Sequence, residues 1–380
     1  MPTFRQFFKI AAVVAAATIG SGVFALPYVI VRAGWLVVIF YFIAFIAVIS
    51  AAHALYLKTL QSVGEKERLL GLSRKYLGTA GFWTGFIAIV IGLLLSFAAY
   101  LILGPQFVRL VFPAVPPAAA LAVFWFIIAV PVFLGDGSAV NLEEFGIFLV
   151  SAVIIFVFIS GHPLRAFLNV PPANLHYFFL PLGVVLFALA GWTGIEPAYD
   201  ASFRKESVLS GKVKPKSGKS VWVAIAFGTV LAAALYFLFA MGILGSAPQV
   251  TTDTISGLAN WPFWKRDIIA VVGLFAIWTV SVPLTRELRN ALEKDLRWNS
   301  LFARFAIVGV PLAAVILGFN DFLAVVSVAG GLFLSTQYIL IVFIGLRALA
   351  FSVAQKIFLA FTAAIFIFAA IYSIYGFVVK

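Results

Sequence analysis

The sequence predicts an all-α protein that crosses a membrane many times, and its composition, its apolar stretches and the placement of its basic residues all support this fold class. Of its 380 residues, 64% are hydrophobic and only 11% are charged, and the mean hydropathy is +1.13. A water-soluble domain of this length needs far more polar surface. Because most long segments are apolar around their whole circumference, we expect a lipid bilayer to cover them.

The apolar stretches give the number and position of the expected membrane spans. The hydrocarbon core of a bilayer is about 30 Å thick, and a helix crosses it with about 20 residues. Eleven stretches of about this length cover residues 8–32, 34–57, 80–104, 118–135, 143–160, 178–200, 219–245, 266–286, 301–319, 322–346 and 357–379. The sequence therefore predicts eleven transmembrane helices.

The 26 Lys and Arg residues indicate the orientation, because basic residues near span ends favour the cytoplasmic side. With the amino terminus in the cytoplasm, 20 of them lie in inner segments and 6 in outer segments. The sequence thus predicts a multi-pass protein of the cell membrane with a cytoplasmic amino terminus. The net charge is +12, but the basic residues lie between apolar runs rather than in one stripe, so we expect no nucleic-acid partner.

Several kinds of chemistry are excluded by residues that the sequence lacks. There is no cysteine, which removes disulfides, thiolate metal sites and thiol nucleophiles. The three histidines, His53, His162 and His176, are not at metal-ligand spacing. The predicted spans also lack a cluster of nucleophile, base and acid. We expect no metal site, no cofactor and no enzymatic activity.

Two of the predicted spans are interrupted by glycine and proline. The first span carries Gly-Ser-Gly at 20–22 and Pro27 after it, and the sixth carries Gly-Trp-Thr-Gly at 191–194 and then Pro197. Backbone freed from a helix at membrane depth is tolerated only where it is buried in protein or lines a cavity. The breaks therefore predict two discontinuous helices beside a cavity, although glycines also allow ordinary helices to pack closely.

The two breaks occupy matching positions in two sets of spans. Five spans separate the start of the first from the start of the sixth. Because five is odd, the second set enters the membrane from the opposite side, which is the pattern of an inverted repeat.

Unwound turns of this kind suit an amino acid. They expose amides on one half-helix and carbonyls on the other, so they can bind a carboxylate and an ammonium without a buried ionised side chain. The expected carboxylate donors are the amides of Gly20, Ser21 and Gly22, with the Ser21 hydroxyl adding one bond. The expected ammonium acceptors are the carbonyls of Leu189, Ala190 and Gly191. Gly22→Val is expected to abolish binding, because the branched side chain would fill the carboxylate position.

Three motifs carry a resemblance to a known family. They are Thr-Ile-Gly-Ser-Gly-Val-Phe-Ala-Leu-Pro at 18–27, Ala-Tyr-Leu-Ile-Leu-Gly at 99–104, and the break at 191–197. In this order they resemble the amino acid/auxin permease family of the amino acid, polyamine and organocation superfamily. The resemblance implies coupled uptake or exchange of amino acids by alternating access.

The same resemblance implies a LeuT-type fold within a single transmembrane transporter domain, residues 1–380. A first five-helix repeat would cover residues 8–160 and an inverted second repeat residues 178–346. One extra helix would follow at 357–379.

The coupling ion, Na⁺ or H⁺, stays open. Sodium-coupled relatives have asparagine where this chain has Ala16. In span eight, the Thr279 hydroxyl could face an ion, or it could form a hydrogen bond with the backbone of its own helix. Glu196 is expected either to cap the second half of span six or to carry a proton. His53 could also titrate near neutral pH, but its place near a span end is more typical of an interfacial residue.

The substrate side chain is expected among spans one, three, six and eight. The candidate wall residues are Tyr100, Trp192, Phe275 and Trp278, together with Thr193 in the sixth-span break. Aromatic walls favour an apolar or aromatic amino acid. The alternative is that these aromatic residues face lipid or fill space, since aromatic residues make up 16% of the chain.

We therefore expect a secondary active transporter, of the symporter kind, that moves small amino acids across the membrane. Two alternatives are an amino acid sensor or binding protein that does not transport its ligand, and a channel. A channel needs a polar stripe or a charged ring along its pore, and no predicted span carries one.

Overall fold

The structure is a computed structural model that describes most of the chain. The residues it describes are 4–63, 68–133, 139–162, 165, 168, 170–199, 219–246, 249–258 and 261–378. Regular structure in these residues is helical, and the described part of the chain contains no strand.

The helices follow one another along the chain; η marks a 3₁₀ or π segment. Those before residue 161 are α1 (Phe4–Thr18), η1 (Ser21–Ala25), α2 (Leu26–Ala33), α3 (Trp35–Val63), α4 (Leu69–Phe86), η2 (Ile87–Ile91), α5 (Gly92–Val111), α6 (Pro117–Phe133) and α7 (Ala139–Ser160). The later ones are η3 (Leu175–Tyr177), α9 (Leu180–Leu189), η4 (Trp192–Gly194), α10 (Ile195–Tyr199), α12 (Lys219–Ser246), η6 (Ile255–Leu258), α13 (Phe263–Arg289), η7 (Asn290–Asp295), α14 (Ser300–Ile316), α15 (Phe322–Val328), η8 (Ala329–Leu334), α16 (Ser335–Ala348) and α17 (Val353–Val378).

The predicted all-α membrane fold is confirmed, and helices lie over each of the predicted apolar stretches. Within the described residues, seven helices are long and apolar enough to cross a bilayer, or eight if the bent pair α1 and η1–α2 is one span. The apolar helices α6 and α14 and the segment Phe148–Ser160 of α7 are shorter than this limit. The total of eleven spans therefore stays a prediction.

The first span is broken where the sequence places its glycines. Helix α1 ends at Thr18, and Gly20 has an extended backbone (φ −132°, ψ −155°) before η1 begins at Ser21. The two halves of the span are bent by 55°. Because Gly20 leaves the helical region of φ and ψ, the helical hydrogen bonds stop there. The unpaired carbonyl groups of the first half and amide groups of the second half are then available to neighbouring elements.

The sixth span is broken in a similar way. Helix α9 ends at Leu189, Ala190 is extended (φ −73°, ψ 96°), and one 3₁₀ turn, η4, leads into α10 at Ile195. The discontinuity of both helices is thus confirmed.

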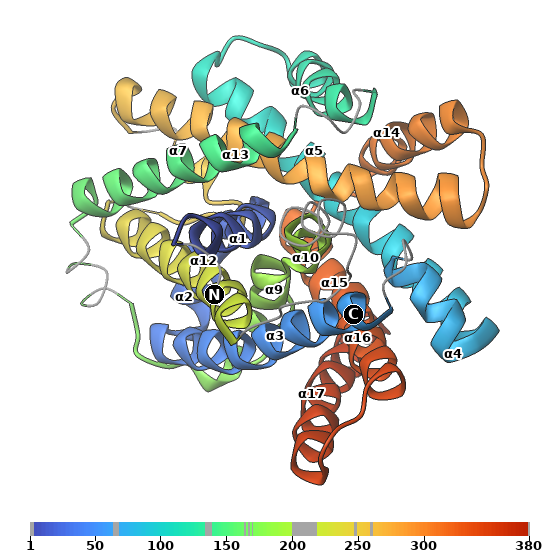
Figure 1. Ribbon diagram of the computed structural model, residues 1–380. Coiled ribbons are helices and arrows are strands. Elements are labelled where there is room, and N and C mark those ends of the chain that lie inside the picture. The colour runs from blue at the N-terminus through green and yellow to red at the C-terminus, as the bar shows by residue number, and fades with distance from the viewer. Residues whose placement is uncertain are drawn as a thin grey trace.

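The two broken spans run antiparallel through the centre of the bundle. The Asn174 amide donates to the Ala33 carbonyl over 2.8 Å, which places the segment leading to α9 beside the end of α2. Figure 1 shows α1, α9 and α10 in the middle, with α3, α12, α13 and α16 around them. We call the end at which α1 begins and α3 and α10 end the N-terminal end of the bundle.

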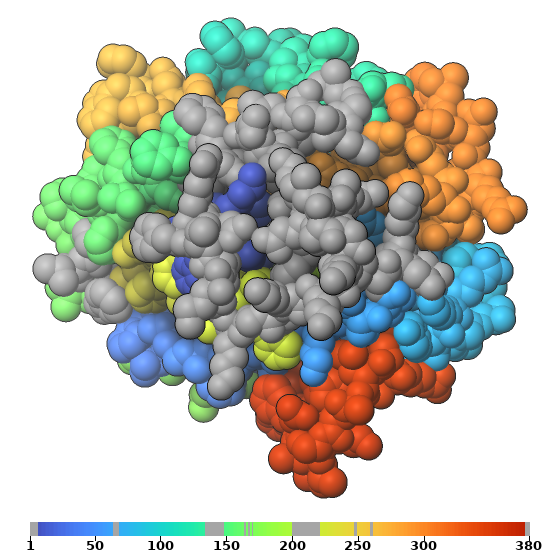
Figure 2. Space-filling view, viewed as in Figure 1, coloured from blue at the N-terminus to red at the C-terminus, as the bar shows by residue number. Residues whose placement is uncertain are grey.

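Peripheral helices present apolar side chains outward. Helix α17 projects at one edge of the molecule (Figure 2), and its exposed residues include Ile357, Phe361 and Ile371. Such a surface is stable next to lipid, where apolar side chains cost nothing to expose.

Candidate substrate site

The breaks of spans one and six contact each other because glycines remove the side chains between them. A Cβ on Gly191 would lie 2.0 Å from Thr18 Oγ1, and a Cβ on Gly22 would lie 2.8 Å from the Ala188 Cα atom. Both separations are far below normal contact. Gly22 therefore has a packing role that the sequence did not reveal: Gly22→Val would push α9 away from η1 and disturb the fold, and would not only fill a carboxylate position.

A cavity of about 30 Å³ lies beside this contact. Its lining consists of Ala17, Thr18, Gly20, Gly22, Leu93, Ser96, Tyr100, Phe187, Ala190, Trp192, Thr193, Val280, Leu284 and Leu334. The volume has room for a few water molecules. An amino acid is larger, so the walls must move apart before one can enter.

Six of the predicted substrate residues line the cavity, namely Gly20, Gly22, Tyr100, Ala190, Trp192 and Thr193. Ser21, Leu189 and Gly191 lie at the two breaks but are not among the residues that line the cavity. The binding roles of all nine stay predictions.

Phe275 and Trp278 are not part of the cavity wall. They are partly buried elsewhere on α13 and pack against each other, with ring centroids 5.9 Å apart. Val280 and Leu284 line the cavity instead. At 100° per residue, Trp278 points about 200° away from Val280, so one helix cannot direct both toward the same space.

A tyrosine from another helix bridges the first break. The Tyr236 hydroxyl, from α12, accepts the Gly20 N–H over 3.1 Å and donates to the Thr18 carbonyl over 2.6 Å. One of the predicted carboxylate donors, the Gly20 amide, therefore already has a partner. Ser21 and Gly22 begin η1, and the first amides of a helical segment lack partners within it. These two amides are the better candidates for an anion.

Side chains from other helices also hold the second break. Trp192 Nε1 donates to Gln337 Oε1 over 2.5 Å, and Gln337 Nε2 donates to the Ala88 carbonyl over 2.7 Å. The Tyr338 hydroxyl lies near the backbone of Gly191 and Trp192. The indole of Trp192 is thereby fixed in orientation at the cavity wall.

His53 belongs to this second network and is not interfacial, which corrects the interpretation from the sequence. It is fully buried, and its Nε2 atom lies 2.9 Å from the Tyr338 hydroxyl. Thr229 Oγ1 is 3.5 Å from Nδ1 of the same ring. His53 thus supports the sixth-span break through Tyr338.

Two buried hydroxyls at the breaks have no hydrogen-bond partner within the described residues. They are those of Ser21 and Thr193, and Thr193 lines the cavity. Buried polar atoms are normally bonded. Unpaired hydroxyls beside a cavity are therefore candidates for bonds to a ligand.

The candidate coupling residues lie in different environments. Thr279 Oγ1 donates to the Ala276 carbonyl of its own helix over 2.9 Å. Glu196, in the first turn of α10, accepts a hydrogen bond from Tyr56 and has Arg68 Nη1 2.8 Å from its Oε2 atom. No group of three or more potential metal-binding side chains occurs in the described residues.

Comparison with known proteins identifies the family. The model of the tryptophan/tyrosine permease family matches residues 4–260, which is more than half of the chain. The chain belongs to the tryptophan/tyrosine permease family. This membership supports the permease resemblance and a transport role rather than an enzymatic one, but not the amino acid/auxin permease family in particular.

Two solved transporter structures share the fold of this permease. MhsT in complex with L-phenylalanine has a TM-score of 0.69 at 14% identity, covering 98% of this chain and 99% of that one. Mhp1, a nucleobase-cation-symport-1 family transporter in a closed conformation with bromovinylhydantoin bound, has a TM-score of 0.60 at 14% identity, covering 96% and 90%. A search of curated protein sequences finds no match. The predicted LeuT-type fold is thus confirmed.

Proposed function

We propose that this permease is a secondary active transporter of aromatic amino acids that works by alternating access. The observation that carries the proposal is the direct contact of two interrupted helices beside a cavity. The family description names tryptophan and tyrosine, and a transporter with a similar fold has been solved with L-phenylalanine. Both facts support an aromatic substrate class over the small amino acids predicted from the sequence.

The backbone of the breaks would bind the amino acid group. The amides of Ser21 and Gly22 start a helical segment, whose positive end favours a carboxylate. The carbonyl ends of α9, at Leu189 and Ala190, would accept the ammonium. The Thr193 hydroxyl, buried and unpaired within the described residues, would add one hydrogen bond.

The side chain would lie in the cavity between the breaks, α5 and α13. Tyr100 and Trp192 offer ring faces, and Phe187, Val280 and Leu284 complete an apolar wall. Burial and aromatic stacking together favour an aromatic side chain over a small one. The hydroxyl group of Tyr100 would distinguish tyrosine and tryptophan from phenylalanine.

Transport requires the cavity to open to each side in turn. The cavity is too small for an amino acid as it stands. We therefore propose that the two broken spans move relative to α5 and α13 during binding and release. We further propose that the two five-helix repeats provide these alternating movements and that the amino terminus is cytoplasmic. Uptake would be coupled to a gradient of Na⁺ or H⁺.

Purified protein in liposomes tests the proposal. Vesicles preloaded with unlabelled tryptophan should accumulate labelled tryptophan and tyrosine by counterflow, and imposed Na⁺ and pH gradients, applied separately, should show which one drives net uptake. Binding without counterflow would favour a sensor. Absence of binding for all twenty amino acids would contradict the proposal.

A further inference from the structure

A buried glutamine that does not line the cavity contacts one of its walls from behind. Gln337, on α16, is 0% exposed and is not among the residues that line the cavity. Its Oε1 atom accepts the Nε1–H of Trp192, which does line the cavity, over 2.5 Å. A residue of α16 is therefore bonded directly to the break of span six.

The other end of the same amide is bonded to a third helix. Gln337 Nε2 donates to the Ala88 carbonyl over 2.7 Å. Ala88 belongs to η2, a π segment between α4 and α5, and π segments are rare and frequent at functional sites. An indole N–H can only donate and a carbonyl can only accept, so these two partners determine which way the amide points.

A glycine provides the space for this amide. A Cβ on Gly92, the first residue of α5, would lie 2.9 Å from Gln337 Nε2 and 2.7 Å from the Phe333 Cβ atom. Phe333 belongs to η8, a second π segment, which packs against η2. The next residues along both chains, Leu93 and Leu334, line the cavity. The two π segments thus enclose the amide directly behind the cavity wall.

The indole of Trp192 is also held on a second side. The Tyr56 ring, from α3, meets it edge to face, with ring centroids 6.2 Å apart and an interplanar angle of 72°. The single polar hydrogen of the indole is bonded to Gln337. Trp192 therefore cannot rotate without losing a buried hydrogen bond, and it offers the cavity an apolar ring without a free N–H.

We propose that Gln337 determines the preference for aromatic substrates from outside the cavity, by fixing the plane of the Trp192 ring and keeping the indole N–H out of the cavity. Aromatic pairs are favourable only in offset-stacked or edge-to-face arrangements, so affinity for an aromatic side chain depends on this plane. An aliphatic side chain depends on burial alone. Gln337 is a positioning residue, and the inference rests on the function proposed above.

A double-mutant cycle separates this role from a merely structural one, in which Gln337 only joins α16 to η2. Gln337→Met keeps the length of the side chain and removes both hydrogen bonds. We expect the affinity of the purified protein for labelled tryptophan to fall about two- to tenfold. In the Trp192→Phe background, which lacks the indole N–H, Gln337→Met should cause no further loss. A structural role predicts the same loss in both backgrounds.

Competition by leucine gives a second measurement. Leucine displaces labelled tryptophan without using aromatic geometry, so its own Kd should be the same in Gln337→Met and in the wild-type protein. The ratio of the leucine Kd to the tryptophan Kd should therefore fall by the same two- to tenfold factor. A general weakening of the site would lower both affinities and leave the ratio unchanged.

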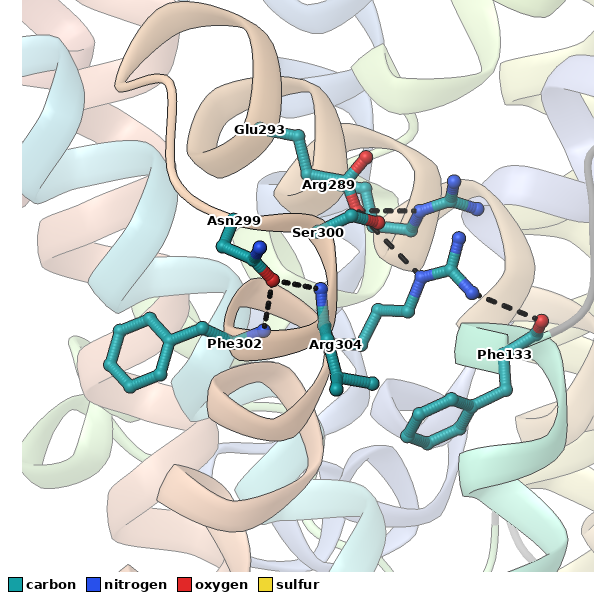
Figure 3. Close-up of polar contacts among 8 residues, drawn as sticks. Phe133, Arg289, Glu293, Asn299, Ser300, Phe302 and Arg304 are labelled. Atoms are coloured by element: carbon teal, nitrogen blue, oxygen red, sulfur yellow. Dashed lines mark hydrogen bonds and ion pairs between the residues drawn. The ribbon is translucent and has the colours of Figure 1, made fainter.

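Two control variants lose polar contacts that do not involve Trp192. Ser335, two residues before Gln337, is buried and donates to the Gly330 carbonyl of the preceding turn, and Ser335→Ala removes that bond. Figure 3 shows Glu293 between two arginines, with Arg289 Nε 3.3 Å and Arg304 Nε 3.8 Å from its Oε1 atom. Glu293 does not line the cavity, and Glu293→Gln weakens these ion pairs. Both variants should keep the wild-type ratio.

The same loss of tryptophan affinity in both backgrounds, or an unchanged ratio in Gln337→Met, would overturn the inference while leaving the proposed function intact. Absence of tryptophan binding in the wild-type protein would contradict the proposed function and this inference with it. Should Gln337→Met not fold, Gln337→Asn serves in its place. Its amide is one methylene shorter and cannot reach both partners, so the ratio is expected to fall equally.

Discussion

The bridge that Tyr236 forms across the first break gives the sharpest prediction about the site. Tyr236→Phe keeps the ring and removes only the hydroxyl. That hydroxyl accepts the Gly20 N–H at 3.1 Å and donates to the Thr18 carbonyl at 2.6 Å. The substitution therefore leaves one buried backbone donor and one buried backbone acceptor unpaired.

Leaving a buried donor or acceptor unpaired costs about 1–3 kcal/mol, so the two groups together destabilise the observed break by about 2–6 kcal/mol. A water molecule entering the vacated space brings the cost toward the lower end of this range. Because every 1.4 kcal/mol corresponds to a tenfold change in an equilibrium constant, we expect the affinity for tryptophan to fall at least about tenfold.

Binding of labelled tryptophan to the purified protein, together with the thermal midpoint Tm, measures both effects. Tyr41→Phe is the matched control, because Tyr41 is a buried tyrosine that packs against Phe45 and Phe178, away from both breaks. We expect the control to change neither quantity. Wild-type affinity and Tm in Tyr236→Phe would refute the view that this hydroxyl holds the broken helix.

Three further substitutions test other contacts of the site. Gly191→Ala should abolish tryptophan binding or folding, because the new Cβ would lie 2.0 Å from Thr18 Oγ1. The control Gly309→Ala, whose Cβ would have no atom within 4 Å, should bind tryptophan normally, and equal behaviour of the two variants would contradict the contact between the breaks. Trp192→Phe leaves Gln337 Oε1 without its indole donor, and we expect a loss of about 1–3 kcal/mol in stability, measured as a lower Tm; an unchanged Tm would show that this bond is dispensable. Thr193→Val should leave Tm unchanged, because the hydroxyl has no partner within the described residues, but should weaken tryptophan binding about tenfold; unchanged affinity would remove Thr193 from the site.

The membrane fold was predictable because its signals are local. A stretch of about 20 apolar residues marks a span regardless of what packs around it. The breaks were predictable for the same reason. Gly20 and Gly191 fall inside apolar stretches at membrane depth, where a water-exposed loop cannot lie. Both therefore appeared in the sequence at their correct positions.

The partners of the breaks were not predictable from local patterns. Tyr236 is 216 residues from Gly20, and His53 is 285 residues from Tyr338. Which tyrosine contacts a break depends on how the helices pack. The stretch of α13 from Ile268 to Trp278 is apolar on all sides, so its rotation could not be predicted, and Phe275 and Trp278 were proposed where Val280 and Leu284 lie.

The burial of Glu287 was not predictable for a different reason. The charged residues from Arg286 onward suggested that span eight ends there, but the helix continues through η7 to Asp295. Glu287 is therefore buried inside the bundle and only 4% exposed. A span end predicted from charge fails where charged residues are paired with other helices and not with water.

A structure of the protein with bound tryptophan tests the central claim most directly. We expect the carboxylate within about 3 Å of the Ser21 and Gly22 amides, the ammonium at the Leu189 and Ala190 carbonyls, and the indole between Tyr100 and Trp192. Tryptophan bound away from both breaks, or held there by ionised side chains, would contradict this claim.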